Sequence, residues 1–552
     1  MRNIRNVIKK LSLLVSSIVL VLFVLSFCIK VKAADKIVIK IDLDKGSIAI
    51  NTTCSGYVTN LDELDDATKA KFTASGTAGK YTWTHSSDYS YYIYQSNNEG
   101  IDGSTIFSEA MEQSDFKDVE AFANKCDEIA ASKGIKTANP SANTANRYGI
   151  TVSGTLGNVE IVMHNVWSTY ISNTAHVPGS LDINVSSTKV VLKLKGYNRL
   201  NRLGWYQAKG GSSSLTFEDG ETDENKKGCV VVVGDQAVVE SCSIGGSYPR
   251  NHWDSAIGGT DGNKASANMI VNSGVIYAGT TPAENCSAFG GGGNGYGAVT
   301  INGGDVYAVC SATGTAIGGG IGHLSHGGGC DVVINGGNIK AYNFGQTFKE
   351  THPNNASKSI PDFVPGTAIG GGSSINSNGN KENANVTING GNVEAYSVSG
   401  SAIGGGNSIN SFGGKGVIKI NGGIVKATSV PNPTYNMLKG TGIGGGSSNN
   451  KNSTNNYGGE ATVVVTGGRI EADGIGGGTS KNGDGGYASV TVTGGTLDSQ
   501  SIGGGLSQTN GYAYGDVTVT GGSMNSTVST VVMGVDNKEV FLTRASIYFN
   551  DI

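Results

Sequence analysis

The chain has 552 residues and a formal net charge of −4, and 86 of its residues are glycine. Glycine occurs without a three-residue period, which excludes a collagen-like protein, and the hydrophobic content of 38% suits a structure with a thin core. The acidic balance and the lack of a basic stripe argue against a nucleic-acid partner.

Residues 1–33 have the features of an export signal. A basic start is followed by an uninterrupted apolar run over 11–29, and Val31-Lys32-Ala33 fits the small-x-small cleavage rule. The apolar run is long for a signal core, so an uncleaved membrane anchor is the alternative. The segment holds six of the 40 basic residues and none of the 44 acidic ones, so the mature chain has a net charge of −10. We expect a Sec-exported protein that is extracellular or attached to the cell surface.

Residues 34–150 are predicted to form a strand-rich N-terminal region with a helical insertion. Strand-like runs and a tyrosine cluster over 89–94 occupy its first part. Apolar residues recur at helical spacing over 115–133, which predicts one amphipathic α-helix. We expect this helix to cap the open end of the core that follows, and the alternative is an insertion along its side.

Residues 151–243 are predicted to be the first, irregular coils of a repeat. Strands are expected at 190–194, 214–217 and 229–233, where apolar residues alternate or run together. Irregular coils fit this place in the chain because the terminal units of a repeat are atypical.

Residues 244–530 contain a regular repeat, and 531–552 form a C-terminal end segment. A small residue, then Ile or Phe, then two glycines occurs eight times, and each copy is followed by a turn of the Ile-Asn-Gly-Gly type. The turn residues are Asn272, Asn302, Asn335, Asn389, Asn421, Thr466, Thr493 and Thr520. Their spacings are 30, 33, 54, 32, 45, 27 and 27 residues, and a shortest period with variable insertions is typical of a stacked solenoid.

One coil, over 385–406, contains three strands and three turns. Residues 386–388 alternate as a short strand, Asn389-Gly390-Gly391 turns the chain, and a second strand follows over 392–395. Ala402-Ile403 forms a third strand before a triple glycine. The coil has no crossover helix, which favours an all-β, three-sided parallel β-helix with about 27 residues per rung.

Stacked coils predict columns of equivalent side chains. The turn asparagines would hydrogen-bond along the axis as a ladder, which Thr466, Thr493 and Thr520 continue with their hydroxyls. An outward column on the second strand contains Tyr277, Tyr307, Lys340, Glu394, Lys426, Glu471, Asp498 and Asn525. We expect this column to be solvated, with opposite charges paired between neighbouring coils from Lys340 to Glu471.

The seven cysteines of the mature chain are scattered and odd in number, so they do not form a disulfide framework. The repeat places Cys242 and Cys310 in one column but two coils apart, too far for a bridge. Buried thiols are therefore expected.

The run 190–200, the strand 214–217 and the repeated AIGGG and INGG blocks resemble β-helical carbohydrate-binding-domain-containing surface proteins of Gram-positive bacteria. Segments 46–57 and 159–161 resemble the N-terminal part of such proteins, whereas 100–145 looks inserted. The resemblance implies an exported, right-handed parallel β-helix, and some relatives bind an acidic or plant polysaccharide.

The insertions after the second strand are long and chemically rich, unlike the Ser-, Asn- and Gly-rich loops after the triple glycine. They leave the same corner of successive coils and are predicted to form one ridge, over 243–255, 280–287, 343–367 and 428–441. Aromatic side chains suit the faces of sugar rings, and Arg or His suits the carboxylate of an acidic sugar. The residues predicted to bind carbohydrate are Tyr248, Arg250, Trp253, Phe348 and Tyr435. The alternative is that the aromatic residues of the ridge cover the flank of the solenoid.

A catalytic role has weaker support. Arg250 and His252 would suit a polysaccharide lyase, whereas hydrolysis needs two carboxylates and Asp254 is the one carboxylate of this cluster.

Metal binding also has weak support, and no cofactor is expected. His323 and His326, near Cys330, have loose metal-ligand spacing without a supporting carboxylate, which favours a decorated turn. Asp261 and Asp484 occur singly in glycine-rich turns, so calcium is unsupported.

The sequence therefore predicts a monomeric, non-catalytic β-helix that binds a polysaccharide, with an acidic or plant cell-wall polysaccharide among the candidates. Two other functions stay open. One is an enzyme that degrades polysaccharide, a lyase more than a hydrolase, and the other is a structural adhesin or stalk that binds a protein.

Overall fold

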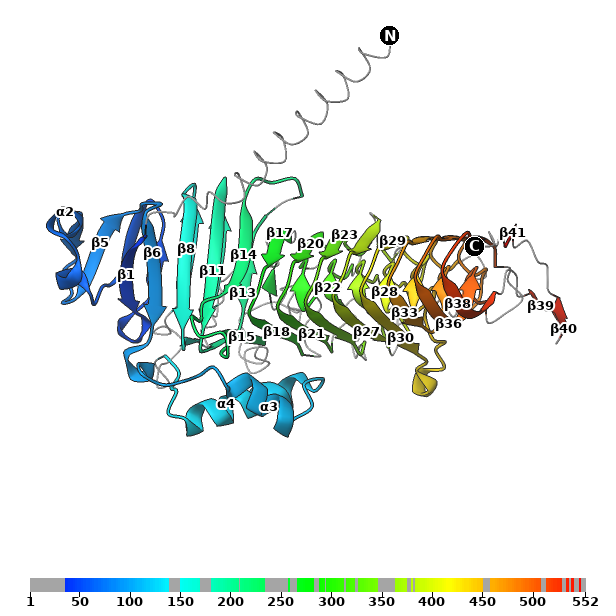
Figure 1. Cartoon of the computed structure of the whole chain (residues 1–552), viewed down its shortest axis with the longest axis horizontal. Coiled ribbons are helices and arrows are strands. Elements are labelled where there is room, and N and C mark those ends of the chain that lie inside the picture. Colours follow the sequence, from blue (N-terminus) through cyan, green and yellow to red (C-terminus); the bar gives the residue numbers. More distant parts are fainter. Residues whose placement is uncertain are drawn as a thin grey trace, which may run out of the picture. The chain divides into compact units, whose positions relative to one another are not determined.

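In a computed structural model the chain forms a parallel β-helix with helices beside its N-terminal half (Figure 1). Val38–Ile552 form one compact unit. The structure describes residues 35–138, 149–168, 180–207, 209–233, 257–258, 266–281, 287–292, 294–311, 314–322, 326–345, 363–374, 379–380, 383–449, 457–507, 513–528, 533–535, 538–540 and 546–547. The predicted export signal lies outside these residues. None of the described helices is long and apolar enough to cross a membrane.

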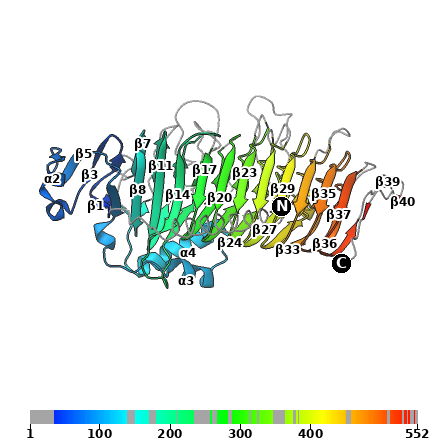
Figure 2. The same ribbon diagram turned by 45° about the horizontal axis from the view of Figure 1, so that its top comes forward.

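The first strand of each coil belongs to a 14-stranded sheet, called sheet A here, which Figure 2 shows as a continuous face. Its strands are β1 (Ile37–Asp42), β6 (Tyr89–Tyr94), β8 (Gly157–His164), β11 (Thr188–Lys195), β14 (Ser214–Asp219), β17 (Ser266–Val271), β20 (Gly297–Ile301), β23 (Cys330–Ile334), β26 (Ala384–Ile388), β29 (Gly416–Ile420), β32 (Ala461–Val465), β35 (Ala488–Val492), β37 (Gly515–Val519) and β41 (Ser546–Ile547). From β6 to β41 every neighbouring pair is parallel, as a solenoid requires.

The second strands of the coils form a second parallel ladder, called ladder B here. It runs through β9 (Trp167–Ser168), β12 (Tyr197–Leu200), β15 (Cys229–Val233), β18 (Val275–Thr280), β21 (Asp305–Cys310), β24 (Asn338–Asn343), β27 (Asn392–Val398), β30 (Ile424–Val430), β33 (Arg469–Ala472), β36 (Thr496–Gly503) and β38 (Ser523–Val528).

The short third strands form ladder C, also parallel. It runs through β2 (Ile48–Ile50), β7 (Ile150–Gly154), β10 (Leu181–Val185), β13 (Leu203–Trp205), β16 (Ile257–Gly258), β19 (Phe289–Gly290), β22 (Thr315–Gly318), β25 (Thr367–Gly370), β28 (Ile403–Gly404), β31 (Ile443–Gly444), β34 (Ile475–Gly476) and the end of β36. Three ladders confirm the three-sided parallel β-helix, and the coil over 385–406 has its strands where the repeat predicts them.

The N-terminal region joins the solenoid through sheet A and ladder C. A small antiparallel group, made of β3 (Thr53–Tyr57), β5 (Lys80–Thr84) and β4 (Phe72–Ala74), extends from β2. Short helices accompany it at α2 (Asp66–Lys69), η1 (Leu43–Lys45), η2 (Leu61–Glu63) and η3 (Ser96–Asn98). Near the other end, β39 (Met533–Val535) and β40 (Lys538–Val540) form an antiparallel pair.

The core consists of apolar columns along the axis. One column on ladder C contains Ile317, Ile369, Ile403, Ile443, Ile475 and Ile502, each at most 2% exposed. Burying one such side chain contributes about 1.5–3 kcal/mol. The five cysteines within the described residues, Cys54, Cys126, Cys229, Cys310 and Cys330, are free and buried, as predicted.

Glycine lets neighbouring coils approach closely at the end of ladder C. Gly404 has φ +140°, and a Cβ added there would lie 1.8 Å from the carbonyl oxygen of Gly444 in the next coil. No other residue fits this distance without moving the backbone, which explains why a glycine follows the Ile or Phe of this strand in all eight copies of the repeat.

The asparagine ladder is confirmed. The amide of Asn302 donates to Asn272, that of Asn335 to Asn302, that of Asn389 to Asn335 and that of Asn421 to Asn389, at 2.6–2.9 Å. The Thr466 hydroxyl continues the ladder by donating to Asn421 at 2.9 Å. The Thr493 hydroxyl donates instead to the carbonyl of Val465 at 3.4 Å, so the predicted continuation is right for Thr466 and wrong for Thr493. The ladder follows one exposed corner of the solenoid.

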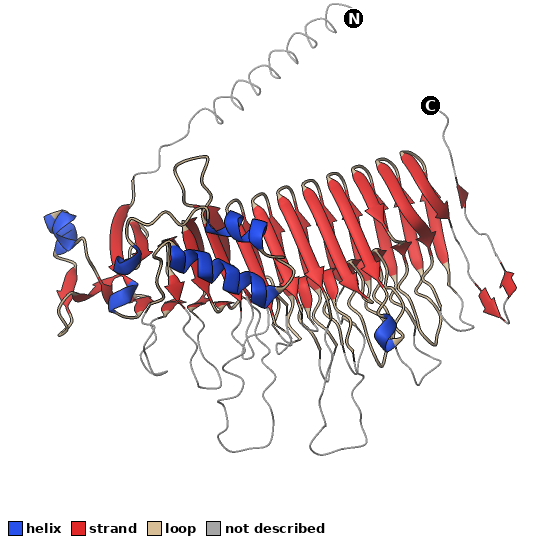
Figure 3. Ribbon diagram, turned by 90° about the horizontal axis from the view of Figure 1, so that it is seen from below, coloured by secondary structure: helices blue, strands red, loops and turns tan. Residues whose placement is uncertain are grey.

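Two helices lie alongside ladder B rather than over the end of the core (Figure 3). The predicted helix is α4 (Val119–Ser132). It is preceded by α3 (Ile106–Gln113), which was not predicted from the sequence. We call these two helices and the residues that join them, 106–132, the helical cover. The expectation of an end cap is therefore wrong, and the alternative of a lateral insertion is confirmed.

The helical cover packs its apolar side on outward residues of ladder B. Phe122 of α4 lies 4.7 Å, between ring centroids, from Tyr277, which is fully buried. Gly279 permits this approach, because a Cβ there would lie 2.6 Å from the Cγ1 of Val119. The expectation that the whole outward column is solvated is therefore wrong in the N-terminal half.

Polar contacts also hold the helical cover in place. The Asp127 carboxylate accepts hydrogen bonds from Arg199 Nε at 3.2 Å and from the Tyr197 hydroxyl at 3.0 Å. The Arg199 side chain is 8% exposed, and its Nη1 donates to the carbonyl of Leu200 at 2.6 Å. Removing one partner of such a largely buried ion pair is strongly destabilising, because the other charge stays buried without a partner.

The predicted charge pairing of the outward column is right at one end and wrong at the other. Lys426 and Glu471 form an ion pair at 3.3 Å. Lys340, in contrast, lies 5.2 Å from the ring centroid of Phe116 in the helical cover, and Glu394 accepts a hydrogen bond from the Tyr342 hydroxyl. Lys340 and Glu394 therefore interact with aromatic side chains and not, as predicted, with each other.

Candidate functional site

Three successive coils place Thr281, Ser311 and Phe344 at one corner of the solenoid. Each residue directly follows a strand of ladder B, so all three lie at the corner that the sequence predicts for the ridge. The beginning of α4 faces the same corner and borders an open hollow of about 450 Å³. This corner hollow is lined by Asp115, Lys117, Asp118, Val119, Glu120, Thr281, Ser311 and Phe344.

One aromatic ring, that of Phe344, lines the corner hollow, and further rings pack against it; together these rings are called the aromatic wall. Phe344 stacks on Tyr342 with ring centroids 6.2 Å apart and is tilted against Tyr396 at 5.8 Å. Tyr342 and Tyr396 are register partners on β24 and β27, and their rings stack at 5.6 Å. The Lys117 ammonium lies 5.2 Å from the Tyr342 ring centroid, a cation–π contact. The neighbouring rings hold Phe344 in place as a preformed apolar surface.

The Tyr342 hydroxyl is fixed as a hydrogen-bond donor. It donates to the Glu394 carboxylate on the next coil. Burial, reinforced by Glu394, raises the pKa of Tyr342 well above the ordinary value for tyrosine. The phenol therefore stays protonated, and the aromatic wall carries no charge of its own.

The helical cover supplies a polar wall. The Asp118 carboxylate caps α4 by accepting from the backbone amide of Ala121 at 3.0 Å, and Asp115 accepts from the amide of Lys117 at 3.1 Å. With Glu120, three carboxylates stand against the single ammonium of Lys117. A carboxylate accepts several hydrogen bonds, so this wall offers acceptors to a ligand that carries hydroxyl groups.

Tyr435 is the predicted carbohydrate-binding residue that the structure describes. It ends the short helix η6 (Pro433–Tyr435), and its ring stacks on that of Phe363 with centroids 5.4 Å apart. Phe363 belongs to another predicted insertion and is 5% exposed, so two insertions of the ridge meet here. Outside the described residues lie Tyr248, Arg250, His252, Trp253, Asp254 and Phe348, whose roles stay predictions.

The loose metal-ligand cluster is described in part. Cys330 is buried, which raises the pKa of its thiol, and its Sγ donates to the carbonyl of Asn385 at 3.8 Å. His326 is half-buried, whereas His323 and Asp261 lie outside the described residues. Within the part of the chain that the structure describes, no three His, Cys, Asp or Glu side chains are grouped closely enough to hold a metal ion.

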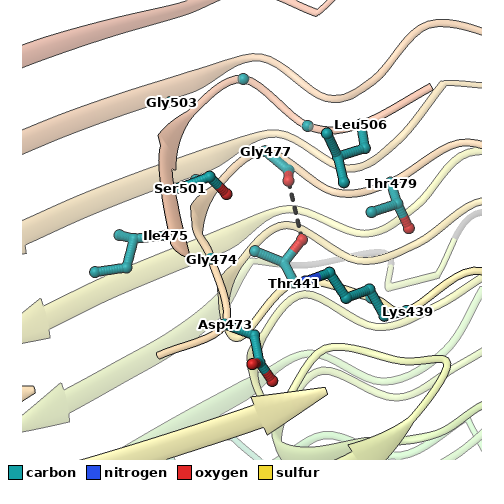
Figure 4. A pocket seen from close by; sticks show the side chains of 14 residues that line it. Lys439, Thr441, Asp473, Gly474, Ile475, Gly477, Thr479, Ser501, Gly503 and Leu506 are labelled. Carbon is teal, nitrogen blue, oxygen red and sulfur yellow. Dashed lines mark hydrogen bonds between the residues drawn. The ribbon is translucent and has the colours of Figure 1, made fainter. Parts of the chain in front are cut away.

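A second hollow, shown in Figure 4, lies further along the solenoid between Lys439 and Leu506. Thr441 crosses it by donating from its hydroxyl to the carbonyl of Gly477 at 2.9 Å. Its volume of about 20 Å³ is enough for one water molecule and too small for a sugar ring.

The sequence pattern does not predict the polar wall or two of the three stacked rings, those of Tyr342 and Tyr396. The signal for the rings was present, because Ala-Tyr occupies the same place in two coils, at Tyr342 and Tyr396. Asp115, Lys117 and Glu120 carried no such signal, since their position depends on where the helical cover docks.

Comparison of the chain with known protein families, with curated proteins and with solved structures found no match. The function is therefore inferred from the geometry of the described residues.

Proposed function

We propose that this chain is a non-catalytic glycan-binding protein, and that the corner hollow receives sugar residues of a polysaccharide. The observation that carries the proposal is the pairing of a rigid aromatic wall with a wall of hydrogen-bond acceptors in one hollow of about 450 Å³. Small-molecule sites have volumes of about 300–1,000 Å³ and combine apolar surface with a few polar groups.

The charges of the corner hollow favour an uncharged sugar. Asp115, Asp118 and Glu120 outnumber Lys117, so an acidic sugar such as galacturonate would meet repulsion. The acidic polysaccharide that the sequence left open is therefore the weaker choice for this site. The export signal and the resemblance to β-helical surface proteins support a place outside the cell, where polysaccharides are abundant.

Replacement of Phe344 tests the proposal. Affinity electrophoresis through gels that contain hydroxyethyl cellulose, galactomannan or polygalacturonate measures binding as retardation. We expect the wild type to be retarded by an uncharged polysaccharide, and Phe344→Ala to lower affinity about tenfold, because the apolar wall is lost.

Phe344→Trp is the matched variant, since it keeps an aromatic face, and it should retain binding. Thermal unfolding of all three proteins shows whether the fold is intact. Equal retardation of Phe344→Ala and the wild type would remove the corner hollow from the function.

A further inference from the structure

Exposed aromatic side chains gather at a second corner, where the loops after the triple glycine enter sheet A. In the described part of the chain, six large hydrophobic side chains are exposed, and four of them lie here. They are Phe412 at 38%, Tyr457 at 42%, Tyr487 at 42% and Tyr514 at 55% exposure. We call these four residues the aromatic edge. Aromatic exposure concentrated at one place marks a binding surface rather than chance.

The aromatic edge follows consecutive coils. The amide of Gly413 donates to the carbonyl of Tyr457 at 3.0 Å, so Phe412 and Tyr457 are neighbours along the axis. The amide of Ala488 donates in the same way to the carbonyl of Tyr514 at 3.0 Å, so Tyr487 and Tyr514 are neighbours on the next two coils. The amide of Ala461 donates to the carbonyl of Tyr487 at 2.8 Å, which places Glu460 beside Tyr487. The rings thus form two pairs, each on two neighbouring coils about 4.8 Å apart, and the second pair lies three residues nearer to its strands of sheet A than the first.

The rings are held in place while part of each face stays open. Phe412 and Tyr457 are nearly parallel, at 11°, with centroids 5.5 Å apart. Stacked carbon atoms touch at about 3.5–4.0 Å, so the two rings must be offset. The Tyr487 hydroxyl donates to the Asp516 carboxylate at 2.6 Å, which fixes that ring without covering it.

The surroundings of the aromatic edge are polar, which separates it from an ordinary protein interface. Lys415 and Glu460 form an ion pair at 3.2 Å in the two coils between which the Phe412 and Tyr457 rings stack. The core of a protein–protein interface is depleted in charged residues, whereas a sugar presents C–H groups to rings and hydroxyls to charged neighbours. Lys415 is neutralised by Glu460, and Asp516 adds a negative charge, so an uncharged glycan fits better than an acidic one.

We propose that the aromatic edge is a second glycan-binding surface, which takes an uncharged polysaccharide lying along several coils. This proposal is based on the exposure and the ring geometry of the four residues, which lie at a different corner from the corner hollow. It shares with the proposed function only the class of ligand. Two such surfaces on one rigid body would let a single long polymer bind more tightly than either surface alone.

Tyr457→Ala and Tyr514→Ala test the aromatic edge in the same electrophoresis through hydroxyethyl cellulose or galactomannan. Each substitution should lower affinity about tenfold, whereas Tyr457→Trp should retain it. Ile424→Ala is the matched control, because Ile424 is 55% exposed at another corner and its loss should leave binding unchanged.

The outcomes separate the two surfaces. Loss of binding in the tyrosine variants with an intact thermal transition supports the aromatic edge, whatever Phe344→Ala does. Wild-type retardation in both tyrosine variants overturns it, even when Phe344→Ala abolishes binding and the corner hollow stands. Sedimentation decides a third case: self-association of the wild type that Tyr457→Ala abolishes would make the edge a protein interface and overturn the proposal.

Discussion

The outward face of ladder B differs between the two halves of the solenoid. In the N-terminal half this face carries Val231 and Tyr277, and the helical cover buries both. In the C-terminal half the same column carries Lys426, Glu471 and Asp498, and it faces solvent. The parallel pairing of ladder B is the same in both halves, so the outward side chains distinguish a covered coil from a bare one.

The helical cover adds layers to a thin solenoid and also creates the corner hollow. Its aromatic residues end the buried region at β24, where Phe116 meets Tyr342 edge to face at 5.3 Å. Phe344 and Tyr396 pack against the edge of this buried region and are themselves half-buried. The corner hollow therefore lies at the boundary between the covered and the bare half.

The largest expected effect comes from the ion pair under the cover. Asp127→Ala should cost about 3 kcal/mol in the stability of the helical cover, because Arg199 stays buried without its carboxylate. Lys426→Ala, which removes a pair whose side chains are 52% and 59% exposed, should cost between about 0 and 1 kcal/mol. Hydrogen exchange of the α4 amides measures the effect of Asp127→Ala, since the helical cover can open locally. Chemical denaturation measures the stability of both variants. Equal effects would contradict the comparison of a covered with a bare half.

The repeat makes most of the fold predictable from the sequence, whereas the docking of the helical cover on ladder B could not be predicted. Strands, turns and the asparagine ladder follow from local patterns that recur in each coil. The outward tyrosines Tyr277 and Tyr307 differ from the Lys and Glu of later coils, but their outward place on the strand alone predicts that they are solvated. Their burial depends on α3 and α4, which come from more than a hundred residues earlier in the chain. The walls of the corner hollow depend on the same docking, so its polar residues could not be predicted.

In the bare half, the stacking of neighbouring coils depends on the close approach of their backbones at the glycines of ladder C. Gly404→Ala should destabilise the bare half by about 1–3 kcal/mol, because the new Cβ would meet the Gly444 carbonyl oxygen 1.8 Å away. Gly154→Ala is the matched control, since Gly154 also has positive φ, +100°, but has no atom within 4 Å of the added Cβ. Urea denaturation of the two variants separates steric overlap from backbone strain. Similar midpoints would show that φ, rather than the approach of the coils, makes glycine necessary.

Substitutions in the asparagine ladder should have the smallest effects on the free energy of unfolding, and these effects should be equal in the two halves. Asn335 lies in a coil beside the helical cover and Asn421 in a bare coil, yet both donate one ladder bond and accept another at an exposed corner. Asn335→Ala and Asn421→Ala should therefore each cost about 0.5–1.5 kcal/mol, and replacement by Thr should restore part of it, as Thr466 shows that a hydroxyl fits the ladder. Urea denaturation of the four variants gives the comparison. A much larger loss at Asn335 would mean that the cover strengthens the coil beneath it, whereas equal losses would confine the difference between the halves to the outward face of ladder B.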